Sequence, residues 1–161
     1  MRRGPAERGF TAVELMVVLA IMAVLVRIAI PVYQGVARDA VASQVLGDFN
    51  AIRAAAVAQF EATGQYAPDG VTGVVPQGMA PFLPRDFKFT KPNYQLDWEN
   101  WAVSDSSNSG ATAGMVLALT VVTPDERVGR YVVATLGRNC THWTVDDAST
   151  FVIASTLESP R

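Results

Sequence analysis

The first part of the chain is almost entirely hydrophobic. Residues 15–26 contain no charged side chain, and the longer stretch 10–32 contains only two, Glu14 and Arg27. At a rise of about 1.5 Å per residue, a helix over this longer stretch would be about 34 Å long. The hydrocarbon core of a bilayer is about 30 Å thick. The pattern therefore predicts an apolar helix that is able to span a membrane.

Beyond Pro31 the pattern becomes amphipathic, with apolar residues three or four positions apart, and charged residues such as Asp48 lie mostly elsewhere. Gly64 is the expected helix stop. We therefore expect one long helix over residues 10–63, bent near Pro31, whose second half packs on a sheet. The predicted core-facing stripe consists of Val41, Val45, Phe49, Ile52, Ala56 and Phe60.

The residue composition changes twice in the rest of the chain. Residues 64–92 hold five prolines and four glycines, which argues against regular structure in a connector over 64–93. Residues 94–161 are rich in β-branched and aromatic side chains, interrupted by a short helix that Asp125 caps and that ends at Leu136. The predicted strands are Tyr94–Val103, Met115–Thr123, His142–Thr144 and Thr150–Ala154.

These patterns predict an α+β fold, in which the long N-terminal helix packs its amphipathic half on a small antiparallel sheet of three or four strands. The expected organisation is a basic leader (1–9), an apolar helix (10–33), its amphipathic continuation (34–63), the connector (64–93) and a β-rich globular head (94–161).

Charge and hydropathy strengthen this division. Mean hydropathy is positive, +0.20, largely because of the apolar stretch. The formal net charge is −2; without the first nine residues Lys and Arg fall from 13 to 10 and Asp and Glu from 15 to 14, which leaves −4. An acidic remainder without a run of Lys or Arg gives no electrostatic footprint for nucleic acid, so we expect no nucleic-acid partner.

The N-terminus permits three interpretations. A secretory signal peptide would share the basic start and apolar core, but Glu14 at the start of the core and the lack of a clear small-residue cleavage site after it argue against this. An uncleaved signal anchor would keep the arginines in the cytoplasm and send the C-terminal part outward. The third interpretation is a precursor cut directly before the apolar helix.

The third interpretation comes from a resemblance. The segment Gly9–Glu14, with the apolar run after it and Pro31 at the far end, resembles the signature of type IV prepilins and of type II secretion pseudopilins. The resemblance implies cleavage by a prepilin peptidase between Gly9 and Phe10, followed by N-methylation of Phe10. It covers about residues 9–33 closely, the amphipathic helix loosely and the head weakly.

The resemblance also implies the residues that assemble a filament, namely Phe10, Glu14 and Pro31. Glu14 of one subunit would face the Phe10 amine of its neighbour, because a buried charge is costly unless it is paired. The alternative is that Glu14 is merely solvated at the headgroup boundary. Pro31 would kink or open the helix. Arg27 departs from the usual pattern and would need to reach headgroups, a carboxylate or carbonyls left open near Pro31.

The resemblance implies a structural subunit, not an enzyme, and no cofactor. Expected partners are other pilin-like subunits, the prepilin peptidase, membrane lipid before assembly and, indirectly, an inner-membrane platform and its ATPase. The subunit would cross the inner membrane once with its head in the periplasm, and later join a periplasmic or extracellular filament. The alternative function is a periplasmic binding or enzymatic domain on an uncleaved anchor.

Chemistry-bearing residues are scarce. Cys140 and His142 would share one face of a strand, and a nucleophilic pair is conceivable, but no orienting group accompanies them. A single cysteine closes no disulfide, which favours a pseudopilin, a minor pilin or a lineage whose pilins lack cysteines. Acidic residues that could bind calcium are too scattered to form a site, and we expect no metal. They are Asp97, Glu99, Asp105, Asp146 and Asp147.

Overall fold

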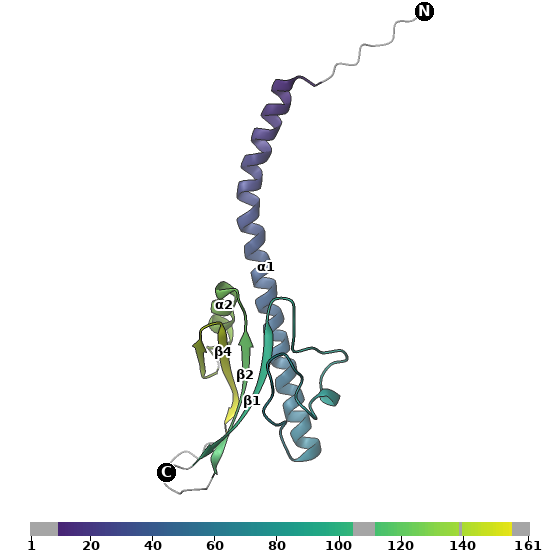
Figure 1. The fold of residues 1–161 in the computed structure, drawn as a ribbon, viewed down its shortest axis with the longest axis vertical. Coiled ribbons are helices and arrows are strands. Elements are labelled where there is room, and N and C mark those ends of the chain that lie inside the picture. The colour runs from purple at the N-terminus through teal and green to yellow at the C-terminus, as the bar shows by residue number, and fades with distance from the viewer. Residues whose placement is uncertain (1–9, 105–111, 139, 156–161) are drawn as a thin grey trace, which may run out of the picture. The chain divides into compact units, whose positions relative to one another are not determined.

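A computed structural model describes residues 10–104, 112–138 and 140–155. The fold is α+β, as predicted, with one long N-terminal helix and a four-stranded antiparallel sheet. Figure 1 shows the elements in chain order. They are α1 (Ala12–Thr63), the short 3₁₀ helix η1 (Ala80–Phe82), β1 (Gln95–Ser104), β2 (Thr112–Val122), α2 (Glu126–Leu136), β3 (His142–Val145) and β4 (Ala148–Ser155).

The chain divides within α1 into two units, residues 1–37 and 38–161. In its described part, the first unit is the N-terminal portion of the helix. The helix continues through Pro31 without a break. The second unit contains the amphipathic part of α1 and every other element. From here on we call this whole unit, and not residues 94–161 alone, the head.

The sheet has the strand order β1-β2-β4-β3, and each pair of neighbours is antiparallel. The connector protects the outer edge of β1: the Gly70 amide donates to the Trp98 carbonyl and the Gly73 amide to the Leu96 carbonyl, each at 2.8 Å. The opposite edge strand, β3, spans only four residues. A covered edge and a short edge both leave few free backbone groups, so the sheet offers little backbone for pairing with a strand of another chain.

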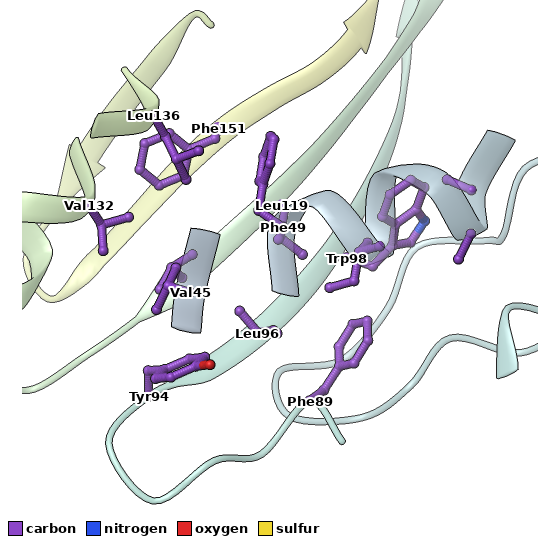
Figure 2. Close-up of a cluster of buried hydrophobic side chains, with 14 of the residues drawn as sticks. Val45, Phe49, Phe89, Tyr94, Leu96, Trp98, Leu119, Val132, Leu136 and Phe151 are labelled. Atoms are coloured by element: carbon purple, nitrogen blue, oxygen red, sulfur yellow. The ribbon is translucent and has the colours of Figure 1, made fainter. Parts of the chain in front are cut away.

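The core lies between the sheet and the two helices. Figure 2 shows Val45 and Phe49 of α1 and Leu136 of α2 meeting aromatic and aliphatic side chains of the strands. Trp98 and Phe151 are fully buried there. The connector adds residues to the same cluster, among them Ala67, Met79 and Phe89. The prediction that the second half of α1 packs on the sheet is therefore confirmed.

Two details of the predicted stripe are wrong. Phe60 is 43% exposed and stacks on Tyr66 of the connector, with ring centroids 4.5 Å apart. Asp48, expected outside the stripe, is only 9% exposed and accepts a hydrogen bond from the Tyr94 hydroxyl at 2.6 Å. Near its end the helix meets the connector as well as the sheet, so the buried face includes Gln59 and leaves Phe60 at its margin.

The local signals around α2 agree with the structure. Asp125 is the N-cap, and its side chain accepts from the Arg127 amide at 2.9 Å. The helix ends at Leu136, with Gly137 as C-cap. Asp146 makes the turn between β3 and β4 with a positive φ of 51°. The connector has no regular element beyond η1, as its prolines and glycines predicted.

Candidate functional site

The start of α1 is closed by a reciprocal pair of hydrogen bonds between Thr11 and Glu14. The Thr11 amide and hydroxyl both donate to the Glu14 carboxylate, at 2.9 and 2.8 Å. In return the Glu14 amide donates to the Thr11 hydroxyl at 3.2 Å. This is a capping box, in which two amides that have no partner in the helix are satisfied by side chains. The carboxylate is thereby held at the helix end.

The large hydrophobic side chains that follow Glu14 are exposed. Phe10 is 81% exposed, and the large hydrophobic residues from Val13 to Val36 are all accessible. The most apolar 18-residue window of α1 has a mean hydropathy of 2.7, and none of it is buried. A core helix of this composition would be covered by protein. One helix in the described part of the chain is therefore long and apolar enough to cross a membrane, a property that signal sequences share.

Pro31 leaves one acceptor of α1 without its usual donor. Proline has no amide hydrogen, so the carbonyl four residues earlier, that of Arg27, receives no intrahelical bond from it. The side chain of Arg27 is exposed and forms no ion pair with a residue in the described ranges. Gly9, the remaining predicted processing residue, lies outside the described residues.

The head contains a buried polar cluster that the sequence patterns did not indicate. Asp48 on α1 accepts from the Tyr94 hydroxyl at 2.6 Å and pairs with the Lys91 ammonium at 3.2 Å. Lys91 also lies 4.8 Å from the centroid of the Phe87 ring. Burial, together with the hydrogen bond and charge of Asp48, raises the pKa of Tyr94. These contacts join α1 to the end of the connector, and we assign them a structural role.

The Cys140–His142 arrangement differs from the prediction. Cys140 lies in a bend before β3, so the two residues do not share a strand, and its thiol donates to the Leu136 carbonyl at 3.1 Å. His142 stacks on Phe151, with centroids 5.9 Å apart. Burial raises the pKa of Cys140, with a smaller opposing effect of Arg53. A nucleophilic cysteine needs the opposite shift, so this arrangement does not activate the thiol.

The acidic residues remain dispersed over separate contacts. Asp97 accepts from the Thr72 hydroxyl, and Glu99 accepts from the Thr120 hydroxyl at 2.9 Å. Burial raises the pKa of Glu99, and the nearby charges of Asp97 and Asp69 add to this. Within residues 10–104, 112–138 and 140–155, no group of three or more His, Cys, Asp or Glu side chains is arranged to hold a metal. Asp105 lies outside these ranges.

Of two features in the structure, the capping box and the cleft between α1 and β4, only the capping box had a signal in the sequence. Thr11 and Glu14 have the Thr-x-x-Glu spacing of a capping box, directly before an apolar run. The cleft between α1 and β4, described below, had no such signal, because its walls come from distant segments. Comparisons of the chain with protein-family profiles, with curated proteins and with solved structures found no match.

Proposed function

We propose that this chain is a structural subunit of a type IV pilus-like filament, cut by a prepilin peptidase after Gly9 and assembled through the N-terminal part of α1. The observation that carries the proposal is the placement of one carboxylate, Glu14, at the start of α1, where the large hydrophobic side chains from Val13 to Val36 are exposed. The resemblance of residues 9–33 to the prepilin signature supports it.

The chemistry of the helix end gives Glu14 a role in assembly. Cleavage would create a free amine at Phe10, one residue before the Thr11 amide that already donates to the carboxylate. In an apolar bundle an unpaired ammonium and an unpaired carboxylate are both costly, and pairing them across subunits reduces both costs. In the single chain the capping box satisfies Glu14 until a neighbour arrives. The pair would also set the axial register between subunits.

Helix packing would supply the remaining contacts. Apolar side chains gain little by leaving lipid for an equally apolar bundle, so the direction of assembly depends on pairing and on close packing. Energy for extraction from the bilayer would come from a separate cytoplasmic ATPase acting through a membrane platform. The head, which carries its own core, would then be displayed along the filament.

Mass spectrometry of protein from its native host tests the processing step. We expect a mature chain that starts at Phe10 and carries one additional methyl group. A chain that retains Met1 would instead indicate a domain tethered by an uncleaved anchor. A start near Pro31 would indicate a secreted domain.

Two substitutions at Glu14 separate its charge from its capping role. Glu14→Gln keeps an acceptor for Thr11 but removes the charge, whereas Glu14→Ala removes both. We expect both variants to be processed and inserted, and filament yield to fall at least about tenfold, the effect of about 1.4 kcal/mol per subunit contact. Filament yield is measured by electron microscopy and by sedimentation of sheared filaments.

The matched control is Glu61→Ala, at an exposed carboxylate in the last turns of the same helix. We expect this variant to assemble like the wild type. Wild-type filament yield from Glu14→Gln would contradict the charge-pairing role, even if Glu14→Ala failed to assemble.

A further inference from the structure

A cleft opens in the head between α1, the end of α2 and the last strand. Its volume is about 560 Å³, within the range of about 300–1,000 Å³ that is usual for small-molecule sites. We call it the α1–β4 cleft. The apolar residues Phe49 and Leu136 line it and are buried, so they form its deep part. The whole cleft lies within the second unit of the chain.

The polar lining of the α1–β4 cleft has one sign of charge. Arg53 and Asn50 of α1 line the cleft and are exposed, as is Thr141 before β3. Among the residues that the structure describes, none that lines the cleft carries a carboxylate. Arg53 makes no ion pair with any residue of the described part of the chain. The rim therefore offers a guanidinium that is free to bind an anion, above an apolar interior.

The positive charge of Arg53 acts on Cys140, another residue that lines the cleft. Cys140 lines the same cleft, and although burial raises its pKa, the Arg53 charge acts on the thiol in the opposite direction. Arg53 and Cys140 both line the cleft, so the guanidinium and the thiol belong to the walls of the same space. A ligand with its anionic group on Arg53 would thus extend its body along Cys140 toward Phe49.

We propose that the α1–β4 cleft binds a small organic acid, with its carboxylate on Arg53 and its apolar body over Phe49 and Leu136. A guanidinium donates two parallel hydrogen bonds to a carboxylate, and a partly enclosed site strengthens such a pair relative to one in water. Asn50 and Thr141 supply further polar groups at the rim. This site is independent of the proposed filament function, because it uses no residue of the first unit.

The single cysteine of the chain provides the readout, since Cys140 lines the cleft. The full-length protein in detergent is alkylated with a maleimide in the presence of 4-phenylbutanoate, 4-phenylbutan-1-ol or 4-phenylbutylamine. These probes share one apolar body and differ in the head group. We expect the carboxylate to slow alkylation at concentrations at least about tenfold lower than the alcohol or the amine.

Substitutions at the rim assign the effect to Arg53. Arg53→Gln should raise the protecting concentration of 4-phenylbutanoate at least about tenfold, and Asn50→Asp should do the same by placing a carboxylate beside Arg53. Arg127→Gln, at another exposed helical arginine, is the control and should leave protection unchanged. Circular dichroism establishes that each variant is folded.

Saturation-transfer NMR of the three probes provides a second measurement, which decides the matter if Cys140 reacts too slowly to follow. Equal binding of the alcohol and the carboxylate, unchanged binding by Arg53→Gln, or no binding of 4-phenylbutanoate would each overturn the proposal. Filament assembly and N-terminal processing do not enter these measurements, so the two proposals can fail separately.

Discussion

At the scale of single residues, Thr11 and Glu14 show how a carboxylate can be retained at the end of an apolar helix. Each side chain satisfies an amide of the other residue, so neither end of the box is left without a partner. Replacing a capping residue by Ala typically costs about 1 kcal/mol. The box therefore stabilises the first turn whether or not a neighbouring subunit is present.

Thr11→Ala should loosen this first turn. A loss of about 1 kcal/mol corresponds to about fivefold faster hydrogen exchange of the Glu14 amide, which donates to the Thr11 hydroxyl. The rate is measured by NMR on the full chain in detergent micelles. Thr11→Ser keeps the hydroxyl and should exchange like the wild type, while an unchanged rate in Thr11→Ala would show that the cap is not formed.

Tyr94 should make the stability of the head depend on pH in the alkaline range. Burial raises the pKa of Tyr94 in the folded head, and Asp48 adds to this, whereas an unfolded tyrosine ionises near pH 10. Above about pH 10 the unfolded chain therefore binds fewer protons than the folded one. The free energy of unfolding should then fall with rising pH, by up to about 1.4 kcal/mol per pH unit for this one proton.

Tyr94→Phe should remove that part of the pH dependence. The measurement is urea unfolding of wild type and variant between pH 9 and pH 11.5, compared by the slope of unfolding free energy against pH. Tyr131→Phe, at an exposed tyrosine, serves as the control. Parallel slopes for wild type and Tyr94→Phe would mean that Tyr94 ionises equally in both states.

At the scale of elements, Asp125 joins two helices at one point. Its carboxylate caps α2 through the Arg127 amide and pairs with Arg38 of α1 at 3.0 Å. The hydrogen bond from Arg38, followed by that from the Arg127 amide, lowers the pKa of Asp125. Its stabilising effect is present above the usual pKa of an aspartate and is lost as the pH falls through the lower folded-state value.

Substitutions at Asp125 should separate the cap from the ion pair. Asp125→Asn retains a good N-cap and loses the charge, so it should cost less than about 1 kcal/mol, because the pair is only part-buried and water still screens it. Asp125→Ala loses both and should cost about 1–2 kcal/mol. Thermal unfolding measures both variants, and Arg38→Gln should add no further loss to Asp125→Asn. Equal losses in the two Asp125 variants would assign the whole effect to the charge.

At the scale of the whole molecule, the two units depend on different surroundings. Within the described part of the chain, the buried residues of the hydrophobic core lie between Ala42 and Phe151, and none belongs to the first unit. The apolar part of the first unit is exposed along its described length. A continuous apolar surface of this extent requires lipid or other protein to cover it. The head, in contrast, carries its own solvent-excluded core.

A chain that begins at Arg38 should therefore fold without the apolar helix. We expect a monomer that is soluble without detergent and whose near-ultraviolet circular dichroism retains the signal of the buried Trp98. Sedimentation velocity and the spectrum test this, with the full chain in detergent as reference. Aggregation, or a spectrum without fixed aromatic signals, would show that the head needs the first unit.

The sequence by itself determined the elements whose cause is local. An uninterrupted apolar run and a three-to-four-residue repeat specify the long helix, and Asp125 and Leu136 mark the limits of α2 through capping and periodicity. Alternating β-branched residues specify the strands to within a few positions. The capping box at Thr11 was equally local, and its Thr-x-x-Glu spacing was present to be read.

Only the tertiary structure decided which polar side chains are buried and where a cleft opens. Asp48 is separated from Tyr94 by 46 residues and Arg38 from Asp125 by 87, so no window of sequence contains either pair. The walls of the α1–β4 cleft likewise come from two helices and a strand. Periodicity reports which side of a helix is apolar on average. Long-range packing sets which segments cover that side, and this determines whether each polar residue is buried or exposed.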